Sequence, residues 1–240
     1  MSGRVRLAFK RPDLLLRRLT VGSNEFSNIS LEEISPYLSG QGWICEAGFS
    51  DGVDTKRLLA KFPNQPLFAM EPVKEQYEFF INSLSSVPEN LILRNMALSE
   101  TDGMAEINVA KSGQGIQGMG SSSLLDPREH LNQFPEIDFN RREIVQTMKL
   151  STAAASVGME KVDLLWLDLQ GLEWAVLSSS TEFVSLNVNA IHVEVSRLEL
   201  YQGMTIYNDF IKGMKLLGFK KVIDRVGTVS GNCLFVNSIY

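Results

Sequence analysis

Short apolar runs alternate with segments of helical periodicity along most of the chain. An apolar run of four to eight residues, bounded by glycine, proline or polar residues, is typical of a buried strand. Such strands are predicted at 43–47, 67–70, 91–98, 162–169 and 190–195, and helices at 55–62, 75–84, 173–180 and near 207–217. Because helices that join consecutive strands form right-handed crossovers, the pattern predicts a three-layer α/β/α sandwich around a mostly parallel sheet.

Two segments depart from this alternation. Residues 105–109 and 144–150 alternate apolar and polar positions, as half-exposed antiparallel strands do, and the Gly- and Ser-rich stretch 113–123 lies between them. They predict a β insertion over residues 99–151, whose central stretch is either a lid or a flexible loop. Residues 220–225 and 232–236 have no helical segment between them, which predicts a C-terminal antiparallel hairpin.

The chain is predicted to form a single domain over residues 1–240. Ser30 and Glu33 have the spacing of a capping box, which predicts a helix start near residue 30. Residues 1–40 are then a basic leader followed by this helix. The leader is either a solvated segment, the simpler reading, or an arm that touches a partner.

Composition narrows the classes of function. The chain is 44% hydrophobic, which is enough for a sizeable core, and its net charge of −5 argues against a nucleic-acid binder. No run of 18 apolar residues is present to span a membrane. Cys45 and Cys233 lie in apolar runs and form no disulfide framework, which favours a reducing cytoplasm. The oligomeric state stays open, a homodimer included.

The carboxyl ends of the predicted strands carry the candidate chemistry, because open α/β sheets bind ligands there. The first strand ends in Glu46-Ala-Gly48-Phe-Ser50-Asp51-Gly52, where glycines allow a sharp turn into the next helix. Glu71 ends the second strand, 19 residues after Gly52 (71 − 52). This is close to the spacing of about 20 at which an acidic residue bonds a nucleotide ribose. A tight turn followed by a solvated glutamate would give the same pattern.

This loop lacks the third glycine of a dinucleotide-binding motif, and its acids would repel a phosphate. It suits a nucleoside that has no phosphate and carries positive charge, and S-adenosylmethionine meets that description. A nicotinamide-dependent oxidoreductase is the alternative enzyme class, although the chain has no Tyr-x-x-x-Lys pair.

Carboxylates also lie near the ends of the fourth and fifth strands. Alternation places Asp168 with Trp166 and Gln170 on one side of the fourth strand, and Glu194 with His192 on one side of the fifth. Two carboxylates are too few to indicate Mg²⁺, so no metal is predicted. His192 is expected to be a core histidine hydrogen-bonded across layers. His130 is expected at the surface.

The ordered motifs together resemble the FkbM family of S-adenosylmethionine-dependent methyltransferases. They are the Glu46–Gly52 loop, Phe68-Ala-Met-Glu71-Pro72, Asn95-Met-Ala97-Leu-Ser99 with Asp102-Gly103, Ser122-Ser123-Leu124, Val162–Glu173 and Val193-Glu194, and the resemblance spans about residues 43–235. It implies a class I methyltransferase (Rossmann-like) sheet and O-methylation of a hydroxyl on a sugar, glycan or small natural product. The implied cofactor-binding residues are Glu46, Gly48, Ser50, Asp51, Gly52, Glu71, Pro72, Asn95, Ala97 and Asp168.

The resemblance also implies roles. The Gly48 loop would hold the methionine part, Glu71 the ribose hydroxyls, and Asp168 would lie near the ammonium or the reacting centre. An alcohol acceptor benefits from a base, and Asp168 and Glu194 are the expected catalytic residues, with His192 a weaker candidate.

Two departures concern the substrate side. The family usually has lysine at the position of Trp166 and glutamate at that of Gln170. Their loss alters the acceptor or weakens activity, so a non-catalytic cofactor-binding module is a further hypothesis.

Overall fold

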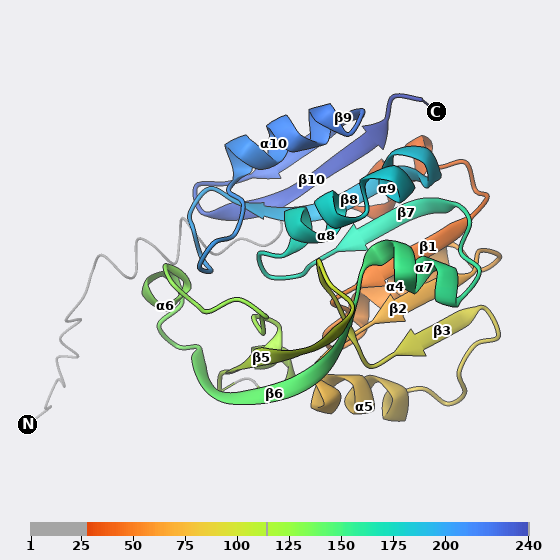
Figure 1. The fold of residues 1–240 in the computed structure, drawn as a ribbon. Coiled ribbons are helices and arrows are strands. Elements are labelled where there is room, and N and C mark those ends of the chain that lie inside the picture. Colours follow the sequence, from red (N-terminus) through yellow and green to blue (C-terminus); the bar gives the residue numbers. More distant parts are fainter. Residues whose placement is uncertain (1–27, 114, 240) are drawn as a thin grey trace, which may run out of the picture.

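The computed structural model describes residues 28–113 and 115–239, and a seven-stranded sheet forms its centre (Figure 1). The strand order is β3-β2-β1-β7-β8-β10-β9. β10 is antiparallel to both of its neighbours, and the other pairs are parallel, as predicted. The strands are β1 Trp43–Ala47, β2 Leu67–Met70, β3 Leu91–Arg94, β7 Val162–Leu167, β8 Val188–Ser196, β9 Phe219–Val226 and β10 Ser230–Asn237.

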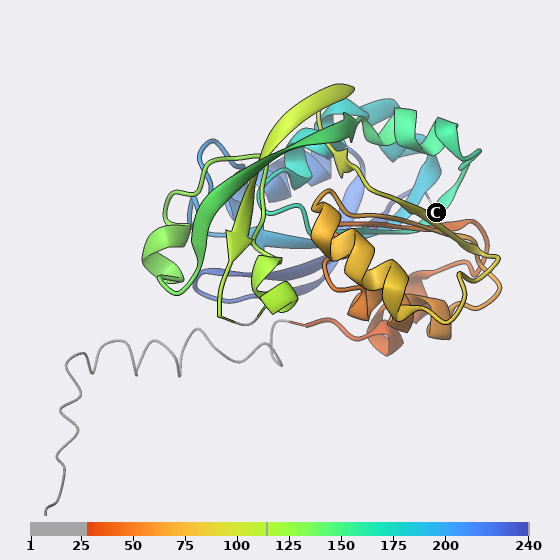
Figure 2. The ribbon, with the colours of Figure 1, turned by 90° about the horizontal axis from the view of Figure 1, so that it is seen from below.

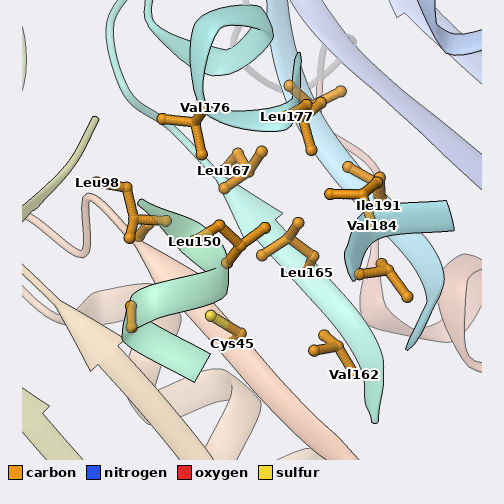
Figure 3. Packing of buried hydrophobic residues seen from close by; sticks show 14 of the residues in the cluster. Cys45, Leu98, Leu150, Val162, Leu165, Leu167, Val176, Leu177, Val184 and Ile191 are labelled. Carbon is orange, nitrogen blue, oxygen red and sulfur yellow. The ribbon is translucent and has the colours of Figure 1, made fainter. Parts of the chain in front are cut away.

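Helices cover both faces of this sheet, which confirms the three-layer architecture. Side chains alternate between faces along each strand, so Leu165 and Leu167 of β7 pack against helices α7 to α9 (Figure 3), while Leu164 and Trp166 face α3 to α5. The helices are α3 Leu31–Ile34, α4 Val53–Lys61, α5 Lys74–Ser83, α7 Leu150–Ser156, α8 Glu173–Ser179, α9 Thr181–Asn187 and α10 Tyr207–Leu216. Of these, α7 and α9 were not predicted, since each is only seven residues long and α7 is rich in Ser and Ala.

The capping box at the start of α3 is formed as predicted. Ser30 Oγ accepts from the Glu33 amide (3.3 Å), and Glu33 Oε2 accepts from the Ser30 amide (3.0 Å). The helix continues only as a 3₁₀ turn, Ser35–Tyr37, which carries a proline near its start. The basic leader lies outside the described residues, apart from those just before α3.

The insertion folds as a second sheet beyond the carboxyl ends of the parallel strands (Figures 1 and 2). It has the order β4-β6-β5, with β4 Ala97–Leu98, β5 Gly103–Lys111 and β6 Asp138–Met148. A 3₁₀ turn, η2 Gly115–Met119, and the short helix α6 His130–Gln133 lie between β5 and β6. At its base the Ser99 amide donates to the Met148 carbonyl oxygen (2.9 Å), so the two ends of the insertion lie side by side.

The predicted third strand, 91–98, is wrong in its extent. β3 ends at Arg94, and Ala97–Leu98 pairs with β6 instead of β2. Asn95 explains the break, because its side-chain amide donates to the carbonyl oxygens of Glu71 and Pro72 and turns the chain there.

Asp163, at the opposite edge of the sheet, is a buried carboxylate with many donors. It accepts from the amides of Ser39 and Gly40 and from the side chains of Gln65 and Asn189, at 2.9–3.1 Å. These bonds join the loop before β1, the turn between α4 and β2, and strands β7 and β8. Both cysteines are free and buried, as expected. None of the described helices is long and apolar enough to cross a membrane.

We predict that Asp163→Asn lowers the free energy of unfolding by about 2 kcal/mol or more, because hydrogen bonds to a charged group each contribute roughly 1.5–3 kcal/mol. Urea denaturation measures this change. Asp209→Asn, which removes one arm of an exposed ion pair with Lys212, is the control and should change stability by less than about 0.5 kcal/mol. Equal effects of the two variants would show that the Asp163 network does not stabilise the sheet.

Candidate functional site

The loop after β1 touches the loop after β7 at Gly48. Gly48 has φ +84°, and a Cβ built on it would lie 1.9 Å from the Asp168 carbonyl oxygen. The Asp168 amide also donates to the Ala47 carbonyl oxygen (3.0 Å). Only glycine therefore allows this contact between the two loops. Asp168 follows β7, which ends at Leu167 and not at Leu169 as predicted.

The same loop is fixed to the end of β2. Glu71 accepts from the Ser50 amide (2.9 Å) and from the Val73 amide (2.8 Å), one bond to each carboxylate oxygen. Gln76 of α5 donates to Ser50 Oγ (2.6 Å), and Ser50 has the left-handed φ of +51°. Gly52 caps α4, and a Cβ there would lie 2.0 Å from the Phe80 ring. The backbone amides at this turn and the Glu71 carboxylate thus share one edge.

A cavity opens where these loops meet the insertion. Its lining includes six of the predicted cofactor-binding residues, namely Gly48, Ser50, Glu71, Pro72, Ala97 and Asp168. The insertion contributes Met119, Gly120, Ser122, Ser123 and Leu124. The cavity measures about 120 Å³, whereas sites for drug-sized ligands are usually about 300–1,000 Å³. The insertion thus forms one wall of this cavity.

Four predicted cofactor-binding residues do not line this cavity. Asn95 supports it by holding the Glu71 and Pro72 carbonyl groups, and Asp51 accepts from the Val53 amide at the start of α4 (3.1 Å). Gly52 packs on Phe80. Glu46 is buried in β1, where its Oε2 has no hydrogen-bond partner among the described residues.

The second group of residues lies at the ends of β7 and β8. Gln170 donates to Asp168 (2.6 Å), and a longer contact of 3.4 Å joins it to Glu194. The Ser230 hydroxyl donates to Glu194 (2.9 Å). The structure thus brings Asp168 and Glu194 together, as predicted. A smaller cavity borders them, and its lining includes Gln170, Glu173, Glu194, Tyr201, Met204 and Ser230.

Burial shifts the ionisation of the acids at this edge. It raises the pKa of Glu46 to about 8 and those of Glu71, Asp168 and Glu173 to about 7, and it also raises the pKa of Glu194. The charge of Glu194 adds to the rise at Asp168. None of these five acids has a salt bridge within the described part of the chain. The edge therefore favours a ligand with positive charge.

The two histidines differ from their predicted surroundings. His192 is a core residue, as expected, but it stacks on Trp166 (ring centroids 3.7 Å apart) and neither ring nitrogen has a hydrogen-bond partner in the described structure. Burial lowers its pKa to about 3, so it is a poor base. The surface position predicted for His130 is wrong. It is 2% exposed and packs among Phe134, Phe139 and Tyr201.

Sequence reasoning missed three residues of this edge. Glu173 accepts from the amides of Leu169 and Gly171, which shapes the turn after β7. Its position in the first turn of the helix, two residues after Gly171, was the sequence signal that could have identified it. Tyr201 and Ser230 reach the edge from loops far along the chain, and no local pattern marks them.

The fold defines the class of protein. A sheet of this order with a closing antiparallel hairpin is that of the class I methyltransferases. A chain of a fibrillarin/Nop5p complex has this fold (TM-score 0.50, 13% identity, covering 83% of this chain and 74% of that one). So does Aeropyrum pernix fibrillarin, solved with natively bound S-adenosyl-L-methionine (TM-score 0.50, 10% identity, 93% and 74%).

The chain belongs to the FkbM methyltransferase family, because the family model for the methyltransferase FkbM domain matches residues 55–221. It is also similar to the 2-O-methyltransferase NoeI of Sinorhizobium fredii. The two are 27% identical over 161 residues, which cover 67% of this chain. The match spans 65% of the length of that relative.

We predict that the free energy of unfolding falls as pH rises from about 5 to 8. The folded pKa values of Glu46, Glu71, Asp168 and Glu173 lie above the values near 4 expected when unfolded, so the folded state holds more protons in this window. The stabilisation from these protons is therefore complete at pH values below the unfolded pKa, and it is lost as the pH rises through the folded pKa. Each extra proton gives a slope of about 1.4 kcal/mol per pH unit.

Glu46→Gln should make this slope shallower, and it should leave the protein as stable or more stable at pH 8, because a neutral amide replaces a buried acid. Urea denaturation at several pH values measures both effects. The exposed Glu100→Gln is the matched control and should keep the wild-type slope. The same slope in Glu46→Gln as in wild type would contradict the prediction.

Proposed function

We propose that this protein transfers a methyl group from S-adenosylmethionine to a hydroxyl of a sugar, glycan or small natural product. The observation that carries the proposal is the cavity at the ends of β1, β2 and β7, where Glu71 and Asp168 face a glycine turn without a counter-cation among the described residues. Family membership supports the reaction, and the similarity to a 2-O-methyltransferase supports a hydroxyl acceptor.

The residues of the cavity fit the three parts of this cofactor. Each oxygen of Glu71 already accepts one backbone bond and keeps a further lone pair, which suits a ribose diol. Asp168 offers a negative charge for the ammonium group, and the turn at Gly48 lets the methionine part approach the backbone. No lysine or arginine lines the cavity within the described chain, which disfavours the phosphates of a nicotinamide dinucleotide.

The bound cofactor would supply an activated methyl group on a sulfonium. The protein then has to place the acceptor oxygen in line with it, and proximity of this kind supplies effective molarities on the order of 10⁵–10⁸ M. Asp168 and Glu194 are the groups we assign to take the hydroxyl proton. Burial raises the pKa of Asp168 to about 7, which improves this carboxylate as a base near neutral pH, and burial also raises the pKa of Glu194.

The insertion is assigned the role of a lid. Met119, Gly120, Ser122, Ser123 and Leu124 of the insertion line the cavity, whose volume of about 120 Å³ is below that usual for sites of drug-sized ligands. Opening would admit cofactor and acceptor, and closure would exclude water from the reacting groups.

We expect Glu71→Gln to weaken binding of S-adenosylhomocysteine by about 10- to 100-fold, because hydrogen bonds to a charged acceptor contribute roughly 1.5–3 kcal/mol. Isothermal calorimetry measures the affinity, and circular dichroism checks the fold. Glu78→Gln, on the exposed side of α5, should bind like wild type. Binding of NAD instead of S-adenosylhomocysteine by wild type would reject the proposal.

Asp168→Asn tests the second acid of the cavity. We expect a loss of cofactor affinity, of turnover or of both, by about tenfold or more, because an amide removes the charge and much of the basicity. Calorimetry with S-adenosylhomocysteine and formation of S-adenosylhomocysteine from S-adenosylmethionine measure the two quantities. If affinity and turnover both stay at the wild-type level, Asp168 has neither role.

A further inference from the structure

The side chain of Gln170 lies between the two carboxylates assigned to the reaction. Its Nε2 is 2.6 Å from Asp168 Oδ1 and 3.4 Å from Glu194 Oε2. A primary amide carries two N–H donors, so one group can serve both acids. The other oxygen of Glu194 accepts from Ser230 (2.9 Å), which fixes that carboxylate from β10.

Tyr201 holds the other end of this amide and connects it to the insertion. Its hydroxyl lies 2.9 Å from Gln170 Oε1 and 2.7 Å from the Ser121 carbonyl oxygen, with its single hydrogen shared between them. The side chain is 1% exposed, so water does not compete for these bonds. A second bond, from the Ser123 hydroxyl to the Gln170 carbonyl oxygen (2.8 Å), joins the insertion to the main chain at the same residue.

The backbone at Gln170 supports a special role. Its φ is +51°, a left-handed conformation that is uncommon for a residue with a side chain and persists when surrounding contacts fix it. The residue also separates the two cavities, because Asp168 lines the larger one while Gln170 and Glu194 line the smaller. A glutamate here could not donate to either carboxylate when ionised, and it would add a third negative charge.

Resting on the proposed methyl transfer, we propose that Gln170 is a positioning residue for Asp168 and Glu194, and that Tyr201 fixes its amide against the insertion. Closure of residues 119–124 and alignment of the two carboxylates then occur together. When the insertion lifts, the bonds from Ser121 and Ser123 are lost and the amide is free to leave the acids. The carboxylates thus reach their working arrangement only in the closed, water-excluding state.

The first test is a titration of the Asp168 carboxyl by ¹³C NMR in the full chain, which needs no acceptor. Gln170→Met removes the donor and should move the midpoint of Asp168 upward by roughly one pH unit. The groups that face Asp168 are all acidic, and they are Glu46, Asp54, Glu71, Glu173, Glu194 and Tyr201. The control Gln146→Met, on the exposed side of β6, should titrate like wild type.

The second test is amide hydrogen exchange in residues 119–124. Tyr201→Phe removes one hydroxyl and should speed exchange there about tenfold, which corresponds to a loss of about 1.4 kcal/mol of hydrogen bonding. Tyr207→Phe is the control, because Tyr207 begins α10 and its hydroxyl bonds Asp224 and Lys221 of β9. Tyr201→Phe should also lower kcat with S-adenosylmethionine and methyl α-D-glucopyranoside, while KM for S-adenosylmethionine stays within about twofold.

An unchanged Asp168 midpoint in Gln170→Met, or exchange in Tyr201→Phe as slow as in Tyr207→Phe, would overturn the inference. A fall in kcat matched by an equal rise in KM for S-adenosylmethionine would also overturn it, as the effect would then lie in cofactor binding. Failure of the wild-type protein to bind S-adenosylhomocysteine would instead overturn the proposed function. The titration and exchange results would still decide whether Gln170 and Tyr201 couple the insertion to the acids.

Discussion

The contact between the Gly48 backbone and the Asp168 carbonyl group is the constraint on which the rest of the site depends. It brings the loop after β1 within van der Waals range of the loop after β7, at the edge where parallel strands end. Glu71 is bonded to the first loop through the Ser50 amide. Gln170 lies in the second loop, two residues after Asp168. A side chain at position 48 would separate the two halves and remove the cavity between them.

Burial of several carboxylates at one edge costs free energy, and no salt bridge within the described residues offsets that cost. Glu46, Glu71, Asp168, Glu173 and Glu194 all ionise less readily than in water. A positively charged ligand would lower this cost, because it would supply a counter-charge to carboxylates that burial has desolvated. Gln170 stabilises the charged forms of Asp168 and Glu194, since its amide supplies hydrogen-bond donors to both acids without adding charge.

Much of the fold could be predicted because its signals are local. The apolar run 43–47 reflects burial of a strand, and the capping box at Ser30 reflects hydrogen bonding of the backbone amides at a helix start. Each signal spans only a few residues, and both features are present in the structure. The third strand was predicted too long because its apolar run continues past Asn95, where a side-chain amide turns the chain. His130 was misplaced for a related reason. Its burial depends on Phe139 and Tyr201, and nothing near it in sequence reveals that packing.

The paired ends of the insertion have a consequence for how acceptors could change between relatives. Because Ser99 and Met148 are joined by a backbone hydrogen bond, the first and last residues of this insertion of about fifty residues lie next to each other. A different insertion could be grafted there without altering the strand register of the main sheet, provided that it kept the backbone hydrogen bonds to residues 199–202 and the contacts to Tyr201 and Gln170. The proposed lid can then differ between relatives while the main sheet and its cofactor-side loops stay the same.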